Sequence, residues 1–394
     1  MSDREVYLVG SARTPIGAFQ GTLASVDAVS LGAAALKGAL SRAEVEAGWV
    51  DETWMGNVLS AGLGQAPARQ AAKSAGIKDH TPATTVSKVC GSGLMSVILG
   101  TKSILLGDAE LVVAGGMESM SNAPYLLPKA RAGFRMGHAR AVDSMIHDGL
   151  WDPYHDFHMG NAGDLCAKEL GFSREEQDAF ATESYRRAHQ MQKDGATKEE
   201  IVPVQFQGRK GEVCVDVDEE PGLAKPEKVP RLRPAFSKDG SVTAANASKI
   251  NDGAAAVVLA SGRAVKERGL SPLARVVAYA SHAQAPEWFT TAPIGASKKV
   301  LEKAGRKKDA VGLWEINEAF SVVALACTRE LELDPQRVNV RGGAVALGHP
   351  IGASGARILV TLLSALQAAE ERVGVATICL GGGEALALMV EYLG

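Results

Sequence analysis

A cysteine stands at a point where the chain passes from a glycine-rich turn into an apolar stretch. Cys90 opens residues 90–93 (Cys-Gly-Ser-Gly), and residues 94–106 that follow have the apolar character of a buried helix. A thiol at the start of a helix lies at the positive end of the helix dipole, which favours the nucleophilic thiolate. Taken alone, the pattern also fits a small buried cysteine in a tight turn.

A histidine occupies a similar position near the other end of the chain. His349 lies within the glycine-rich residues 342–355, between Gly348 and Pro350. Such a turn would hold the imidazole rigidly, as a general base or an oxyanion donor requires. A histidine that only caps a helix is the structural alternative.

A second cysteine follows an apolar run instead of preceding one. Cys379 directly follows the run 373–378, and three glycines at 381–383 come after Leu380. Consecutive glycines leave backbone N–H groups exposed, and such groups can stabilise an anion. The alternative is an inert buried cysteine at the end of a strand.

A polar pair interrupts the apolar segment at residues 315–320. Asn317 and Glu318 stand where a strand would lead into a helix. The amide of Asn317 could hold a water molecule or a carbonyl oxygen, or it could simply cap the helix, a role that Asn favours.

The elements that would position these residues follow from periodicity. Ala-rich helical periods at 29–40 and 354–369 alternate with apolar runs that end in glycine, which predicts strands of a buried sheet with helices between them. The runs are at residues 6–10, 111–116, 257–262 and 375–382.

Two related halves are visible in this pattern. The first offers a strand, residues 90–93 and an apolar helix; the second offers residues 338–345, then 349–352, then a helix at 353–366. The intervening stretch is polar, and residues 173–176 in it have the pattern of a helix capping box. We predict an N-terminal half at 1–118 and 248–270, an inserted loop domain at 119–247, and a C-terminal half at 271–394.

Composition narrows the class of protein. The chain has 394 residues, a net charge of -3 and 46% hydrophobic residues, which is typical of a globular enzyme and gives no reason to expect nucleic acid or a membrane as partner. Five cysteines without CxxC spacing, and no export signal, favour a reducing, cytoplasmic location. Acidic and His residues crowd positions 143–158, but their spacing matches no standard metal site, so we predict no metal.

The motifs around Cys90, Asn317, His349 and Cys379, in this order, closely resemble those of the thiolase family. Residues 119–124, 158–161 and 245–253 also resemble thiolase segments, so that the resemblance covers essentially the whole chain. It implies an α/β, five-layered α-β-α-β-α fold built from two similar halves, with a loop domain inserted between them.

The resemblance also implies roles for individual residues. Cys90 would accept the acyl group, His349 would activate it, and Cys379 would be the acid/base for the second substrate. Asn317 would hold a water that forms one oxyanion hole with His349, and the N–H groups of Cys90 and Gly381 would form the other. The expected substrate-binding residues are His158, Met159, Ser248, Ala319 and Phe320.

The implied reaction is the reversible joining of two acetyl-CoA molecules to acetoacetyl-CoA and CoA through an S-acetyl-cysteine. Two cysteines suit this reaction, because an acylated thiol cannot also act as the base. CoA thioesters are substrates and no cofactor is expected; the family suggests a homotetramer or homodimer.

Three alternatives remain open. A degradative 3-ketoacyl-CoA thiolase would use the same catalytic residues on longer chains, although residues 154–159 and 288–289 could narrow the pocket. A ketoacyl synthase would lack the second cysteine loop. A non-catalytic CoA- or lipid-binding relative would have no reason to keep all four reactive groups.

The chain departs from the thiolase pattern at a few positions. Arg341 replaces the usual Asn before Gly-Gly, and Glu384-Ala385 follows the triple glycine; both could alter the rim of the pocket. The segment 219–225 lacks the basic pattern of many relatives, which leaves Lys225, Lys228 and Arg231 as candidates to bind the CoA phosphate.

Overall fold

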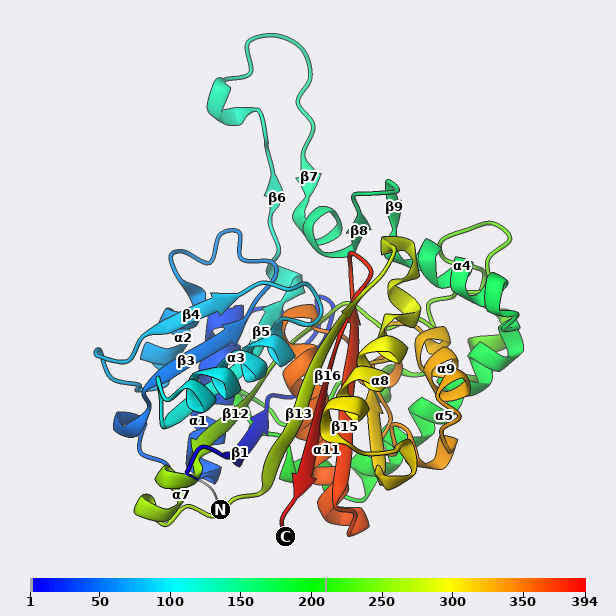
Figure 1. Ribbon diagram of the computed structural model, residues 1–394. Coiled ribbons are helices and arrows are strands. Elements are labelled where there is room, and N and C mark those ends of the chain that lie inside the picture. The colour runs from blue at the N-terminus through cyan, green and yellow to red at the C-terminus, as the bar shows by residue number, and fades with distance from the viewer. Residues whose placement is uncertain (1–2, 210) are drawn as a thin grey trace.

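The computed structural model describes residues 3–209 and 211–394 as a mixed α/β structure around one large sheet (Figure 1). The ten-stranded sheet has the order β14-β15-β16-β13-β1-β12-β5-β3-β4, with β2 paired to β12. Its strands are β1 (Val6–Arg13), β2 (Gly17–Ala18), β3 (Glu52–Gly56), β4 (Ala83–Val86), β5 (Leu111–Ser119), β12 (Asn251–Ser261), β13 (Ala274–Ala283), β14 (Leu313–Ile316), β15 (Val373–Leu380) and β16 (Glu384–Tyr392). The predicted runs 6–10 and 111–116 lie wholly in β1 and β5, and the runs 257–262 and 375–382 lie in β12 and β15 except for their last residues, Gly262 and Gly381–Gly382.

The sheet consists of two halves with the same arrangement of strands. In the first, β3 runs parallel to β5, and β5, β12 and β1 are antiparallel in turn. In the second, β14 runs parallel to β15, and β15, β16 and β13 are antiparallel in turn. Within the described part of the sheet, the two halves are joined where Tyr7 and Leu8 of β1 pair with Arg275 and Ala274 of β13. The two similar halves predicted from the sequence are therefore present.

Helices complete five layers. Two apolar helices, α3 (Ser92–Leu106) and α11 (Ile351–Ala369), lie between the half-sheets and share one core with both of them. The outer face of the first half is covered by α1 (Ala28–Arg42) and α2 (Pro67–Ser74), and that of the second by α8 (Ala292–Ala304) and α9 (Ser321–Glu330). The short helix α7 (Gly262–Arg268) follows β12.

The central helices α3 and α11 approach each other closely because glycines line their contact. A Cβ on Gly93 would lie 2.7 Å from the backbone nitrogen of Ala356, and one on Gly355 would collide with the backbone of Leu94. Residues 89–106 and α11 are long and apolar enough to cross a membrane, but 61% and 89% of them are buried inside the protein. The central layer thus accounts for their apolar character and brings their first turns together.

The stretch between β5 and β12 has two parts. A long arm that contains β6 (Tyr125–Leu126) and β7 (Val142–Asp143) projects away from the body (Figure 1). The remainder packs on the body and contains β8 (Trp151–Asp152), β9 (Phe157–His158), α4 (Met159–Leu170), α5 (Arg174–Lys193), β10 (Val204–Gly208), β11 (Gly211–Val215) and α6 (Glu220–Leu223). The capping box at Ser173 and Glu176 is confirmed at the start of α5. The predicted boundaries of the loop domain remain a prediction.

The second half has no counterpart of a full strand before its histidine. Within residues 338–345, Val338 makes only an isolated bridge to Trp314, and the chain then enters the short helix α10 (Ala344–Leu347). Gly342, with a φ of +78°, turns the chain between them. The segment 338–345 is therefore a turn and a helix, where the first half has β4.

Arg341 does not reach the rim of the pocket, contrary to the sequence expectation. Its guanidinium is buried, 3.1 Å from Glu200, and it donates to the carbonyl oxygen of Ser364 at 2.8 Å. Glu200 also pairs with the fully buried Arg13. The residue that departs from the family pattern is thus part of a buried ionic network.

Candidate active site

The first turns of α3 and α11 open onto one cavity of about 200 Å³ with a mostly apolar lining. Most of the predicted site residues line this cavity, which we call the acyl cavity: Cys90, His158, Met159, Ser248, Ala319, Phe320, His349 and Gly381. Cys379 and Asn317 do not line it; both are buried, and the backbone N–H of Ala319, which lines the cavity, donates to the carbonyl oxygen of Asn317. The structure therefore gathers residues that are far apart in the sequence.

Cys90 lies in a strained turn between β4 and α3. The preceding residue, Val89, has a φ of +46°, an unusual conformation for a β-branched residue. Burial raises the pKa of the Cys90 thiol to about 12, although the backbone N–H groups of Cys90 and Gly381 point at it and act in the opposite direction. The expectation of a lowered pKa at the helix start is therefore wrong, because desolvation outweighs the helix end. This thiol needs a base.

His349 is a neutral imidazole with one free nitrogen. Burial, helped by the charge of Arg357, lowers its pKa to about 3. Its Nδ1 lies 2.6 Å from Ser354 Oγ, and that hydroxyl donates its only hydrogen to the carbonyl oxygen of Pro350. Nδ1 must therefore carry the proton and donate it to Ser354. Nε2 is left with its lone pair, buried and without a partner among the described residues, and can accept a proton.

Cys379 is the last residue but one of β15 and is a buried neighbour of Cys90. Its pKa is raised, first by burial and next by the nearby Cys90 thiol. It belongs to an apolar cluster with Met159, Phe289 and Phe320, all of which also line the acyl cavity. The two cysteines, one from each half, are therefore neighbours: Cys90 lines the acyl cavity, and Cys379 is buried beside it.

Asn317 follows β14 and is fully buried. Its Oδ1 and Nδ2 have no hydrogen-bond partner within the described part of the chain. An unsatisfied buried amide is costly, so its presence points to a contact with substrate or bound water. The helix that follows begins at Ser321 with Phe320 as its cap, so the alternative that Asn317 caps a helix is wrong.

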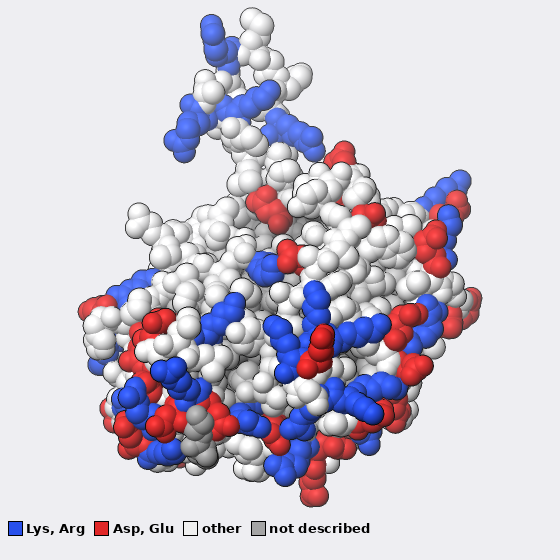
Figure 2. Space-filling model, in the orientation of Figure 1, with Lys and Arg blue, Asp and Glu red and all other residues white. Residues whose placement is uncertain are grey.

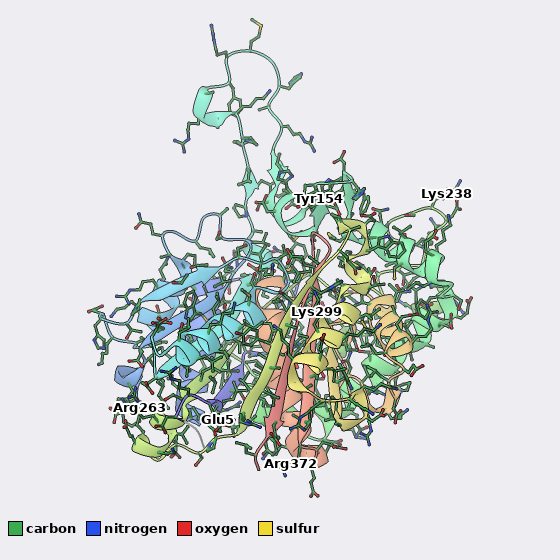
Figure 3. All side chains as sticks on the ribbon, in the orientation of Figure 1. Glu5, Tyr154, Lys238, Arg263, Lys299 and Arg372 are labelled. Carbon is green, nitrogen blue, oxygen red and sulfur yellow. The ribbon has the colours of Figure 1, made fainter. Side chains whose placement is uncertain are left out.

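Aromatic rings close the acyl cavity. His158 stacks on Phe236 with ring centroids 4.6 Å apart, and Phe320 meets Phe236 and Phe289 edge-on. Phe236 was missed from the sequence, because no motif distinguishes it; Gly160 is the one signal, since a Cβ there would collide with the Phe236 ring. Tyr154, expected to narrow the pocket, is 68% exposed and lies on the outside (Figure 3).

A second cavity, of about 280 Å³, adjoins the first. Lys225 and Lys228, two of the predicted phosphate-binding candidates, line it, whereas Arg231 is exposed and does not. Lys249 lines both cavities. The second cavity therefore offers positive charge next to the acyl cavity.

Comparison with known proteins agrees with this geometry. Residues 6–263 match the family model of the thiolase N-terminal domain, and residues 270–392 match that of the thiolase C-terminal domain. The chain belongs to the thiolase family.

Relatives of this thiolase are similar over nearly their whole length. Acetyl-CoA acetyltransferase 1 of Arabidopsis thaliana is 52% identical, over 100% of this chain and 95% of that protein. The acetyl-CoA acetyltransferase of Yarrowia lipolytica is 53% identical, over 98% and 96%. A crystal structure of a thiolase from Ascaris suum in complex with coenzyme A superposes with a TM-score of 0.94 at 48% identity, over 99% of this chain and 100% of that one.

Proposed function

We propose that this thiolase is an acetyl-CoA C-acetyltransferase, which reversibly converts two acetyl-CoA molecules into acetoacetyl-CoA and CoA. The observation that carries the proposal is that Cys90 and His349 line one small acyl cavity and that Cys379 is a buried neighbour of Cys90. The names of relatives that are about half identical over nearly the whole chain support it.

The first half-reaction transfers an acetyl group to Cys90. His349 Nε2 takes the proton of the Cys90 thiol, and the thiolate attacks the carbonyl carbon of acetyl-CoA. The N–H groups of Cys90 and Gly381, which already point at this sulfur, stabilise the oxyanion. The CoA thiolate leaves and takes a proton from Cys379. The products are S-acetyl-Cys90, imidazolium on His349 and a thiolate on Cys379.

The second half-reaction forms the carbon–carbon bond. The Cys379 thiolate removes an α-proton from a second acetyl-CoA, and the enolate oxygen is stabilised by the His349 imidazolium and by a water held on Asn317. The enolate carbon attacks the acetyl group, and Cys90 leaves as a thiolate that recovers its proton from His349. All three groups return to the neutral forms that their shifted pKa values favour.

Preference for a short acyl chain follows from the walls of the acyl cavity. Met159, Phe236, Phe289 and Phe320 surround a space of about 200 Å³, which suits an acetyl or acetoacetyl group. Steady-state thiolysis of acetoacetyl-CoA and 3-ketohexadecanoyl-CoA tests this: we expect the short substrate to be strongly preferred. Preference for the long one would support a degradative 3-ketoacyl-CoA thiolase, and CoA binding without thiolysis of either would support a non-catalytic relative.

The second cavity is suited to the CoA nucleotide. Lys225 and Lys228 place two cations there, as binding of a phosphate requires, and no cofactor is needed for the chemistry proposed. Substitution of both lysines by Ala should raise the KM for CoA without changing kcat.

The projecting arm supports assembly into a homo-oligomer. Leu127, Phe134 and Met136 are 49%, 49% and 98% exposed on it, which is unfavourable for an isolated chain. Lys and Arg residues also gather on the arm (Figure 2). Light scattering after gel filtration should give a dimer or tetramer that Phe134→Asp with Met136→Asp dissociates.

A further inference from the structure

We propose that Lys249 is a positioning residue of this enzyme, whose ammonium group acts as a built-in cation that joins the segment of Ser248 to the segment of His349. The inference rests on the proposed function. Lys249 is not needed for the chemical steps described above, and it was not among the residues that the sequence singled out.

The surroundings of the Lys249 ammonium resemble those of a bound cation. Nζ donates to the carbonyl oxygens of Ala247 at 3.1 Å and Val345 at 3.2 Å, and it lies 5.3 Å from the centre of the Tyr185 ring. Backbone carbonyls are the ligands that a hard cation prefers, and an aromatic face adds a further attraction. The Lys249 ammonium thus occupies a position whose surroundings would also suit a small monovalent cation.

The ammonium is charged at neutral pH although Lys249 is partly buried. Burial lowers the pKa of Lys249 to about 8, while the carboxylates of Glu220 and Glu318 act in the opposite direction. Removing an ammonium even partly from water is costly unless polar groups compensate for the lost hydration. Neither carboxylate contacts Nζ directly, so the two backbone carbonyls provide its direct hydrogen bonds among the described residues.

Lys249 is connected to His349 along two routes. On one, Val345, whose carbonyl accepts from Lys249, donates its N–H to Glu318 at 3.1 Å and belongs to α10, immediately before the His349 turn. On the other, Glu220 accepts from the side chain of Asn251 at 3.1 Å, and Asn251 accepts from the backbone N–H of His349 at 2.9 Å. The Lys249 ammonium therefore helps to hold His349 in place in two ways: through α10, which precedes the His349 turn, and through Glu220 and Asn251.

The Lys249 ammonium also helps to fix the position of Ser248. The N–H of Ser248 donates to the carbonyl oxygen of Ala319 at 3.0 Å, and the preceding residue, Ala247, accepts from Lys249. Loss of the ammonium would leave two buried carbonyls without their donor and would remove from Glu220 the cation that acts on it. The segments of Ser248 and His349 would then move apart, and a displacement of about 1 Å can lower a rate by about a hundredfold.

The test is to remove the charge and then to restore it from solution. Lys249→Met keeps the length of the side chain, and we expect it to lower kcat for acetoacetyl-CoA thiolysis by about tenfold to a hundredfold, with a smaller change in KM. Lys249→Ala leaves space for a free cation, so ammonium or K⁺ should restore much of its kcat, whereas tetramethylammonium at equal ionic strength should not. The wild type should respond to none of these ions.

Lys303→Met is the matched control. Lys303 also donates to a backbone carbonyl, that of Tyr279 at 3.2 Å, and lies 5.6 Å from the centre of the Tyr279 ring, but on the exposed surface of α8. This variant should keep wild-type kcat.

A second readout separates this inference from the proposed function. The rate at which iodoacetamide alkylates Cys90, read by mass spectrometry, depends on His349 but not on the substrate. We expect Lys249→Met to slow it. An inactive wild type in which Lys249→Met still slows alkylation would overturn the proposed function alone. Wild-type kcat and alkylation in Lys249→Met, or equal recovery of Lys249→Ala with tetramethylammonium, would overturn the role of Lys249.

Discussion

Each half of the protein places the start of one helix at the acyl cavity, α3 in the first half and α11 in the second. The turns that precede the two helices are stabilised by different kinds of contact. The Cys90 turn is held locally: Ser92 Oγ accepts from Lys88 N at 2.8 Å and donates to the carbonyl oxygen of Val89 at 2.6 Å. The His349 turn is held from a distance. Asn251 binds its backbone, and Glu118 of β5, in the other half, accepts from the N–H of Gly352 at 2.9 Å.

The difference follows from the chemistry of the two side chains. A thiol is reactive from any rotamer that reaches the substrate, so a strained local turn with two N–H groups aimed at the sulfur is sufficient. An imidazole must present one nitrogen in one direction, and Ser354 and Asn251 fix both the tautomer and the turn. The two similar halves thus supply two equivalent helix starts. The residues around each start determine that Cys90 acts as the nucleophile and His349 as the base.

The largest effect should separate the two cysteines. Cys90→Ala should lose acetylation and turnover, on the order of 10⁶-fold for a covalent nucleophile. Cys379→Ala should still acetylate Cys90, because that step abstracts no α-proton, but more slowly, because CoA must then leave without a proton from Cys379; condensation should nearly stop. Intact-mass spectrometry after mixing with acetyl-CoA reads the first step, and Cys214→Ala, at an exposed thiol, is the control.

Acetylation of Cys90→Ala but not of Cys379→Ala would reverse the two roles. Loss of acetylation in both folded variants would mean that the thiols act as one unit.

Asn317→Ala tests the unsatisfied buried amide. We expect kcat to fall by about 10²–10³, the usual result of removing one oxyanion donor. Because the amide has no hydrogen-bond partner among the residues that the structure describes, thermal unfolding should change little. A folded variant with wild-type turnover would contradict the assignment.

Ser354→Ala tests how far the rigidity of the His349 turn matters. The acceptor for Nδ1–H is lost, the imidazole can turn or change tautomer, and kcat should fall by about tenfold. Ser354→Thr, which keeps the hydroxyl, should lose less. Equal activities of the two variants would show that the hydroxyl does not orient the base.

Glu384→Gln tests a contact that links the two cysteine loops. Glu384, which follows the triple glycine, pairs with Lys88 at 2.6 Å, and the side chains are 34% and 25% exposed. A partly exposed pair contributes at most about 1 kcal/mol, so the fall in kcat should be a few-fold. Lys88→Met should have the same effect, and the double variant no more; additive losses would argue against coupling through this pair.

The smallest expected effect is on the pH dependence of acetylation. An ordinary histidine would be protonated as pH falls through about 6.5 and would cease to act as a base. Burial lowers the pKa of His349 to about 3, so the imidazole stays neutral from pH 8 to pH 5. Release of CoA in a single turnover should therefore show no inflection near pH 6.5, and an inflection there would contradict this.

What the sequence determined by itself is local. The periods of apolar residues predicted β1, β5, β12 and β15 and the central helices, because a strand or helix buried on its faces must be apolar at the matching spacing. The same holds for the capping box at Ser173 and for the turns of Cys90 and His349, where glycines precede an apolar helix. These features depend on neighbours along the chain.

What only the tertiary structure decided depends on residues that are distant in sequence. The direction of the Cys90 pKa shift is one case, since the helix start favours thiolate but burial outweighs it. The inward turn of Arg341 toward Glu200, and the cluster of carbonyls around Lys249, are others. Desolvation and the pairing of buried charges depend on how segments that are far apart are packed together, and no local pattern records that packing.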